Sequence, residues 1–217
     1  MIFWAFKIYK VIYHPTIPDL VFVGTSSGIF RSDDNLQTWT NLLSNGGDVT
    51  DIAFHPTNPN IIYIYDNDYW GTNQNVVLKS TDLGLSYTSS SPISGNNDAT
   101  GHLSVSNDCH NCVYFASNNG VWKSVDEGQN FTFLINPSQS CDGFAVNDLD
   151  TSHLIYGYVD LEASSDGGQT FNQITYWSLG NNNHNASNFM DAFHNSQHYI
   201  HADLRVLRCI NGVFYAG

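Results

Sequence analysis

A short stretch of sequence occurs four times along the chain, and its spacing limits the possible folds more than any other feature. Each copy has a Ser two residues before an Asp and an aromatic residue five positions after that Asp. The aspartates are Asp34, Asp82, Asp126 and Asp166, so successive copies are 48, 44 and 40 residues apart. A repeat of this length indicates an array of similar supersecondary units. The spacing therefore predicts one small unit used four times.

Each copy has the composition of a tight turn. An Asp at the start of a loop can accept hydrogen bonds from backbone N–H groups that follow it. A Gly two residues later permits a positive φ, and the closing aromatic residue buries apolar area. Leu36 replaces this Gly in the first copy and Asn130 replaces the usual Thr in the third, which predicts a looser first turn. The predicted turn residues are Ser32, Asp34 and Trp39; Ser80, Asp82, Gly84 and Tyr87; Ser124, Asp126, Gly128 and Phe131; and Ser164, Asp166, Gly168 and Phe171.

The repeated phrase Ser-x-Asp-x-Gly-x-Thr-aromatic resembles the Asp-box, or BNR repeat, of sialidases, sortilin-type receptors and xyloglucan-cleaving propellers. The resemblance covers nearly the whole chain, and it implies a β-propeller. In that family the box is a structural turn on the blade periphery, away from the face that binds ligand. The resemblance therefore implies a structural role, not a catalytic one, for the four aspartates.

The segments between the turns have the pattern of short strands bounded by Pro, Asn and Gly, four to a repeat. A fifth repeat is expected to have a first strand over 204–207, a turn over 209–212 and a second strand from 213. We therefore predict an all-β propeller of four-stranded antiparallel blades in one domain, residues 1–217, with about four and a half blades. An open ring leaves a raw sheet edge, so the favoured interpretation is part of a larger ring. The alternative is a small ring in which the first and last segments share a blade.

The charge balance excludes several classes of partner. The formal net charge is −13, with only 7 Lys and Arg, so we expect no nucleic-acid partner and no anionic lipid surface. No run of 18 apolar residues occurs, so we expect no membrane insertion. Charged residues make up only 12 % of the chain, and Asn, Ser, Thr, Gly and Tyr are abundant. With the family resemblance, this composition predicts a secreted or cell-surface protein.

The cysteines and histidines give no metal pattern. Cys109 and Cys112 have C-x-x-C spacing without a second pair nearby, so they form either a small disulfide across a turn or two free thiols. Cys141 and Cys209 cannot be paired from the sequence. The histidines at 194, 198 and 201 have helical spacing but are better explained as polar surface residues. We therefore predict no metal and no cofactor.

Two long loops and two further carboxylates are candidates for ligand binding. One loop places carboxylates beside aromatic rings, which suits a sugar; the alternative is an acidic solvated loop with its Trp packed on a neighbouring blade. In the second loop, the stretch from 201 to 205 resembles the His-x-Asp-x-(His/Arg) start of a blade strand in bacterial secreted Asp-box propellers, where it points into the central cleft. The predicted ligand-binding residues are Asp66, Asp68, Tyr69 and Trp70 in the first loop, Trp177, His201 and Asp203 in the second, and Asp142 and Asp160 at the same face.

Catalysis is the point on which the sequence departs from the family. Glycoside hydrolysis requires two carboxylates that flank the scissile bond. In xyloglucanase-like relatives a Thr-Asp-x-Gly-Gly turn supplies one of them, and the matching stretch, Gly24 to Gly28, has Ser26 in the Asp position. Sialidase chemistry requires three clustered arginines and a Tyr–Glu pair, which this sequence does not offer.

Three hypotheses follow. The preferred one is a module that binds a polysaccharide, another glycan or an extracellular protein, without catalysis in this segment. The second is the N-terminal part of a glycoside hydrolase, with Asp66, Asp68 or Asp142 as the local acid or base. The third is a structural scaffold or fibre subunit.

Overall fold

The computed structural model describes residues 7–43, 47–67, 75–93, 100–136, 138–175 and 206–217, and every regular element in these ranges is a β-strand. The strands form four antiparallel sheets of four strands and one two-stranded hairpin. We call the sheets blades one to four in chain order. The prediction of an all-β fold with four-stranded antiparallel blades is confirmed.

The strands of each blade follow one another along the chain and pair in sequence order. Blade one contains β1 (Ile8–Tyr13), β2 (Val21–Thr25), β3 (Gly28–Ser32) and β4 (Thr40–Leu43). Blade two contains β5 (Val49–Phe54), β6 (Ile62–Asp66), β7 (Val76–Ser80) and β8 (Thr88–Ser89). Blade three contains β9 (Gly101–Val105), β10 (Val113–Ser117), β11 (Gly120–Ser124) and β12 (Thr132–Ile135). Blade four contains β13 (Gly143–Val146), β14 (Leu154–Gly157), β15 (Leu161–Ser164) and β16 (Asn172–Gln173), and the hairpin contains β17 (Leu207–Ile210) and β18 (Val213–Ala216).

The hydrophobic core lies between the blades. The second strand of every blade is buried along its whole length, and in blades two to four the neighbouring units cover both of its faces. A strand buried on both faces has a nearly continuous apolar sequence, as in Ile62–Asp66. One apolar cluster fills each of the four spaces between successive units. Blades one and two share Phe22 and Ile64, blades two and three Tyr65 and Phe115, blades three and four Tyr114 and Phe144, and blade four and the hairpin Leu161 and Leu207.

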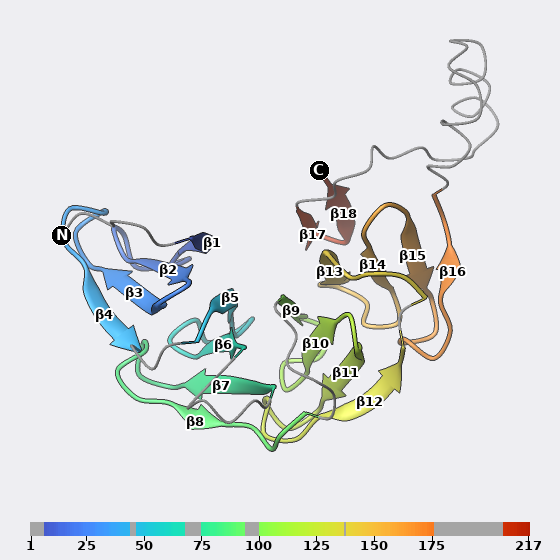
Figure 1. Cartoon of the computed structure of the whole chain (residues 1–217), viewed down its shortest axis with the longest axis horizontal. Helices are drawn as coiled ribbons and strands as arrows, with labels where there is room; N and C mark the ends of the chain where they lie inside the picture. The colour runs from blue at the N-terminus through green and yellow to red at the C-terminus, as the bar shows by residue number, and fades with distance from the viewer. Residues whose placement is uncertain (1–6, 44–46, 68–74, 94–99, 137, 176–205) are drawn as a thin grey trace, which may run out of the picture.

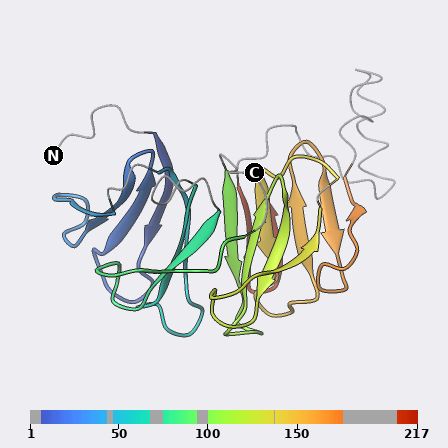
Figure 2. The same cartoon turned by 60° about the horizontal axis from the view of Figure 1, so that its bottom comes forward.

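The blades are arranged along an arc, with the first strand of each at the centre (Figure 1). Neighbouring inner strands contact one another in the order β1, β5, β9, β13 and β17. Figure 2 shows the sheets standing side by side, with their connections gathered at the two ends of the strands. This radial arrangement of four blades and a hairpin agrees with the predicted four and a half blades.

The turn of the last hairpin begins later than predicted. The turn consists of Asn211 and Gly212, both with positive φ (52° and 77°), and Cys209 pairs with Phe214 across the ladder. The prediction of a turn that starts at Cys209 was therefore wrong. An Asn-Gly pair between two apolar runs is the strongest short hairpin signal, since both residues tolerate a left-handed backbone. The Asn-Gly pair by itself places the turn at 211–212.

The four Ser-x-Asp turns have the same hydrogen bonds. In each, the Ser Oγ accepts the backbone N–H four residues later at 2.8–2.9 Å. The Asp Oδ1 accepts the N–H four residues after the Asp, also at 2.8–2.9 Å. Leu36 makes the bond that Gly makes elsewhere by adopting a φ of 74°. The first turn is therefore no looser than the others, and that prediction was wrong.

Candidate functional site

The connections between strands separate the two ends of the blades. Because the strands are antiparallel, the turn from first to second strand and the Ser-x-Asp turn lie at one end, which we call the turn end. The loops from second to third strand and the links between blades lie at the other, which we call the face end. Of the predicted ligand residues, Asp66, Asp142 and Asp160 lie at the face end. The remainder, Asp68, Tyr69, Trp70, Trp177, His201 and Asp203, lie outside the described residues.

Backbone N–H groups and side chains of the same turn donate hydrogen bonds to the aspartates of the Ser-x-Asp turns. The hydroxyl of Thr38 and the hydroxyl of Ser86 are the largest causes that lower the pKa of Asp34 and of Asp82 to about 2. The backbone N–H of Asn130 does the same for Asp126. An acid with so low a pKa stays ionised at neutral pH and cannot donate a proton. The turn end therefore offers no acid for catalysis from these residues.

The turns also connect to the rest of the structure. Within each blade the residue after the Asp binds the first turn through its backbone N–H, as Glu127 does to the Asn111 carbonyl at 2.9 Å. Between blades, Arg31 Nη1 donates to the Leu83 carbonyl at 3.1 Å, and Lys79 forms an ion pair with Glu127. These contacts give the residues named here a structural role at the turn end.

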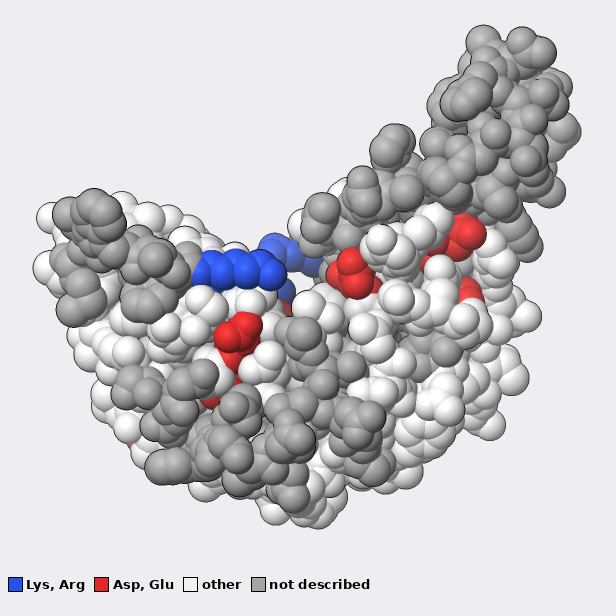
Figure 3. All heavy atoms as spheres, in the orientation of Figure 1, with Lys and Arg blue, Asp and Glu red and all other residues white. Residues whose placement is uncertain are grey.

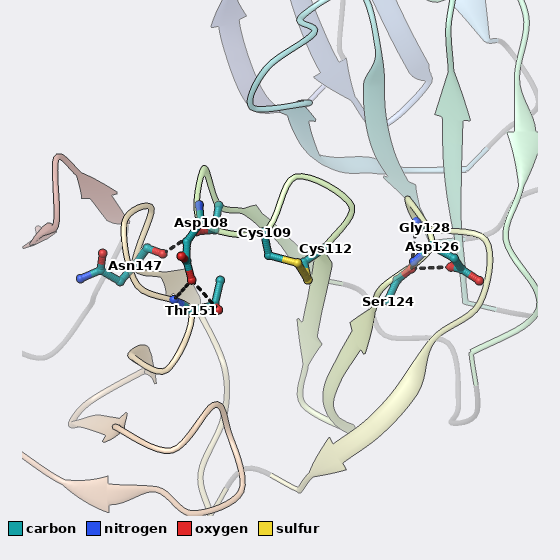
Figure 4. The surroundings of a disulfide bond; sticks show 9 residues. Asp108, Cys109, Cys112, Ser124, Asp126, Gly128, Asn147 and Thr151 are labelled. Carbon is teal, nitrogen blue, oxygen red and sulfur yellow. Dashed lines mark hydrogen bonds between the residues drawn. A yellow bond between two sulfur atoms is a disulfide. The ribbon is translucent and has the colours of Figure 1, made fainter.

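A disulfide closes the first turn of blade three. Cys109 and Cys112 are bonded, so the disulfide alternative of the sequence analysis is the one found. Beside it, Asp108 Oδ2 accepts the N–H and the hydroxyl of Thr151 in blade four, at 3.1 and 2.9 Å (Figure 4). Cys141 and Cys209 form no disulfide with any described residue. In the described part of the chain, no group of three or more His, Cys, Asp or Glu side chains could hold a metal ion.

The three described face-end carboxylates differ in accessibility. Asp66, the last residue of β6, is only 1 % exposed, so its carboxylate does not face solvent. Asp160 is half-buried and accepts Gln173 Nε2 at 2.9 Å. Asp142 is half-buried, and its backbone N–H donates to the Gly157 carbonyl at 3.0 Å. Of the three, Asp142 lines a cavity.

This axial cavity has a volume of about 470 Å³ and lies among the inner strands of all four blades and the hairpin. Figure 3 shows the molecule hollowed at the centre of the arc, with the visible Lys and Arg atoms around the hollow. The acidic and basic side chains that line it, His102 included, come from four different inner strands and one link between blades. They are Lys10, Asp51, His102, Arg208 and Asp142.

One pair of charges in the cavity wall is internally satisfied. Lys10 Nζ lies 2.6 Å from Asp51 Oδ1, and Asp51 is 4 % exposed. The two Asp51 oxygens also accept the backbone N–H groups of Ile52 and Leu103, each at 2.8 Å. A buried carboxylate needs such partners because its desolvation is costly. The ion pair joins blades one and two, and the bond to Leu103 connects them to blade three.

The other polar groups in the wall have unused bonding capacity. Burial lowers the pKa of His102, and the nearby Lys10 acts in the same direction, while Asp51, a hydrogen bond with the Cys141 backbone and Asp142 act in the opposite direction. His102 is therefore neutral at pH 7, and its buried Nε2 has no hydrogen-bond partner within the described ranges. Arg208 and Asp142 form no ion pair with any described residue.

The loop that carries Asp142 is held by a buried acid that the sequence analysis missed. Glu162 is 8 % exposed and accepts hydrogen bonds from the hydroxyls of Tyr156 and Ser138. Ser138 N donates in turn to Tyr156 Oη at 2.9 Å. Burial, followed by the bond to Glu162, raises the pKa of Tyr156 to about 12. The polar cluster fixes the start of the link that leads to Asp142.

Glu162 stands where the other blades have apolar side chains. It lies two residues before the Ser of its turn and pairs with Tyr156 across the sheet. The equivalent cross-strand pairs are Val23 with Phe30, Ile64 with Leu78, and Phe115 with Trp122. An alignment of the four repeats would have shown this difference. A single Glu in a strand otherwise suggests only a solvent-facing position.

The stretch that matches the catalytic turn of xyloglucanase-like relatives contains no acid. Thr25 Oγ1 donates to the Gly28 carbonyl at 3.0 Å, and Ser26 Oγ accepts the backbone N–H of Lys7 at 3.0 Å. The first bond closes the turn between β2 and β3, and the second ties that turn to the residue before β1. They leave no carboxylate at the position that the resemblance marks as catalytic.

The chain is similar to several known proteins. No family model matches it. It is 26 % identical over 190 residues to a xyloglucanase of Hypocrea jecorina (strain QM6a), which covers 74 % of this chain and 22 % of that protein. The crystal structure of an ancestral GH74 enzyme superposes with a TM-score of 0.67 at 20 % identity, over 77 % of this chain and 25 % of that one. A structure of a nidogen/laminin complex matches with a TM-score of 0.64 at 12 % identity, over 96 % and 71 % of the two chains.

The fold is a β-propeller. At these identities the likeness to the GH74 enzyme and to the nidogen/laminin complex shows the propeller architecture and nothing finer. The propeller spans about a fifth of the length of the curated xyloglucanase and a quarter of the GH74 chain. Its described part contains no helix with the length and apolar character needed to cross a bilayer.

Proposed function

We propose that this chain is a secreted or cell-surface propeller, of the Asp-box type, that binds a polysaccharide through the face end of its blades without catalysing a reaction in this segment. The observation that supports it most is the contrast between the ends. The aspartates of the four Ser-x-Asp turns accept backbone N–H groups of their own turns, whereas Asp142 is half-buried at the cavity and forms no ion pair with any described residue. The similarity to a xyloglucanase favours a plant-type glucan as the polymer.

The similarity also favours one second candidate, the N-terminal part of a glycoside hydrolase. In that case Asp142 is the described residue best placed to act as acid or base, because Asp66 is buried and Ser26 replaces the expected Asp. A hydrolase requires a second carboxylate on the other side of the scissile bond. That residue would lie outside the described ranges.

Two measurements on the purified chain test these proposals. Affinity electrophoresis in gels that contain tamarind xyloglucan, barley β-glucan or no polysaccharide measures binding, and a reducing-end assay on the same polymers measures hydrolysis. Binding that weakens in the Asp142→Asn variant, without new reducing ends, supports the binding module. Asp150→Asn, an exposed carboxylate at the turn end, is the matched control and should bind as the wild type does.

The alternatives give different results. New reducing ends that disappear in Asp142→Asn would show a hydrolase. Retardation that is equal in wild type and Asp142→Asn would place the polymer elsewhere on the molecule. No retardation on any polymer, with ordered self-association in sedimentation runs, would leave the scaffold hypothesis.

A further inference from the structure

We propose that the axial cavity is a pocket for a single neutral sugar ring, bound by hydrogen bonds to Asp142 and Arg208. The inference rests on the proposed function and deepens it, since it names what part of a polysaccharide enters the centre of the propeller. A pocket of this kind recognises a chain end or a side-branch sugar. An extended main chain would instead lie across the face end.

The size of the cavity fits such a ligand. Pockets for small molecules measure about 300–1,000 Å³, and the axial cavity has about 470 Å³. It therefore has room for one or two sugar rings and a few waters. Phe54 and Phe144 contribute apolar surface to the wall, which suits the C–H faces of a pyranose.

The free polar groups suit hydroxyls. A sugar hydroxyl both donates and accepts, so it matches a site that offers both kinds of partner. Asp142 supplies carboxylate acceptors, and Arg208 supplies up to five N–H donors in a fixed fork. Both residues line the cavity, one directly before β13 and one on β17, and these two strands are neighbours.

The charge of the pocket favours a neutral ligand. Three of the six described cations are bonded away from the cavity: Arg31 with Asp33, Lys79 with Glu127, and Lys123 over the Tyr114 ring. Lys7 lies over the ring of Tyr9, which lines the cavity, but Lys7 does not line it. The remaining two, Lys10 and Arg208, line the cavity together with two carboxylates, Asp51 and Asp142. With His102 neutral, the positive and negative charges there are equal in number. In a protein of net charge −13 the cavity is a locally balanced site.

Blade four, which holds the link to Asp142 in place, has a polar pair where the other blades have an apolar one. Replacing a buried apolar pair by Tyr156 and Glu162 costs stability unless their polar atoms are bonded. Here these atoms hold Ser138, and Gln139 Nε2 donates to the Asp160 carbonyl at 2.9 Å. The link from blade three to blade four is thus fixed by polar contacts before it reaches Asp142. Pre-organised supporting contacts of this kind are what a precise binding group needs.

The test uses simple sugars, separately from the polymer. Saturation-transfer difference NMR and isothermal titration calorimetry are run with methyl xyloside, methyl glucoside and methyl galactoside, and with sodium galacturonate as the charged probe. We expect at least one neutral glycoside to bind, with affinity at least tenfold lower in Arg208→Gln and in Asp142→Asn. Asp150→Asn, at the turn end, should bind like the wild type.

A second variant tests the role of the support. Tyr156→Ile combined with Glu162→Leu gives blade four the apolar pair of blade two, so the protein should fold with equal or greater stability. Binding of the neutral glycoside should nevertheless weaken several-fold, because the link to Asp142 is no longer held. Unchanged binding in this variant would remove Glu162 from the proposal.

The failure of this inference differs from the failure of the proposed function. If xyloglucan retards the protein but no methyl glycoside binds, or if Arg208→Gln has no effect, the pocket proposal is wrong and polymer binding stands. Preferential binding of galacturonate would show that the cavity takes an anion, which also overturns the proposal. If neither polymer nor simple sugar binds, both fail together.

Discussion

The turn end of the propeller repeats the same contacts in every blade, whereas the residues of the face end differ from blade to blade. At the turn end, four Ser-x-Asp turns repeat the same two hydrogen bonds with lengths that differ by no more than 0.1 Å. At the face end the blades have unlike residues, and the polar groups of the cavity wall come from five different segments of the chain. The comparison indicates that the repeated hydrogen bonds of the Ser-x-Asp turns stabilise the fold. Glu162 departs from the repeat in the blade that carries Asp142, where we propose that the site lies.

The largest effect that tests this contrast is on stability. Ser124 is 1 % exposed and its Oγ accepts the Gly128 N–H at 2.9 Å, so Ser124→Ala leaves a buried donor without a partner. We expect the free energy of unfolding to fall by about 1–3 kcal/mol in urea titrations. Asp142→Asn at the face end should change it by less than about 0.5 kcal/mol, since the carboxylate has no structural bond to lose. Equal losses in the two variants would contradict the division of roles.

The fold could be predicted from the sequence because the repeat is local. The Ser-x-Asp phrase, its spacing and the apolar second strands each lie within one blade, so they can be read without knowing which blades are neighbours. The same information placed Asp142 and Asp160 at the correct end. The turn of the last hairpin is shorter than the predicted 209–212, because only Asn211 and Gly212 leave the ladder and adopt positive φ.

The cavity could not be predicted, because it is a property of the arc. Lys10, Asp51, His102 and Arg208 are far apart in sequence and meet only when successive blades bring their inner strands together. The ion pair between Lys10 and Asp51 joins one blade to the next, and no sequence feature of either repeat predicts it. Burial of Asp66 is equally invisible from sequence, since it depends on the neighbouring strands of blade two.

A smaller effect is expected where the first turn departs from the other three. Leu36 adopts a φ of 74°, which costs an L residue with a side chain about 1–2 kcal/mol. Leu36→Gly removes that cost but adds about 0.5–1 kcal/mol of backbone entropy, so a net gain of up to about 1.5 kcal/mol is expected. The converse control is Gly128→Ala, where φ is 81° and the nearest atom to a new Cβ is 3.4 Å away, so strain is the main change. Chemical denaturation should move the two variants in opposite directions, and movement in the same direction would refute the strain argument.

The smallest effect concerns the histidines of the first turns. His14 Nδ1 accepts the Ile17 N–H at 2.9 Å, and His14 Nε2 lies 3.1 Å from the Pro59 carbonyl of blade two, so the ring is neutral with its proton on Nε2. His55 Nδ1 accepts the Asn58 N–H at 3.1 Å. Burial lowers the pKa of both histidines below 6.5. Below pH 6.5 the unfolded chain therefore binds protons that the folded chain does not, and stability falls as the pH falls.

Blade four provides the substitution that tests this pH dependence. Asn147 occupies the position of these histidines, accepts the Leu149 N–H at 2.9 Å and donates to the Gly212 carbonyl at 3.2 Å. His14→Asn with His55→Asn should therefore keep the turn contacts while removing two titrating groups. Between pH 7.5 and 5.5 the free energy of unfolding should fall less steeply in this variant than in the wild type, with the buried His102 accounting for part of the slope that remains. Identical slopes would mean that the turn-end histidines do not couple folding to protonation, and that the acid sensitivity of the propeller belongs to its axial cavity.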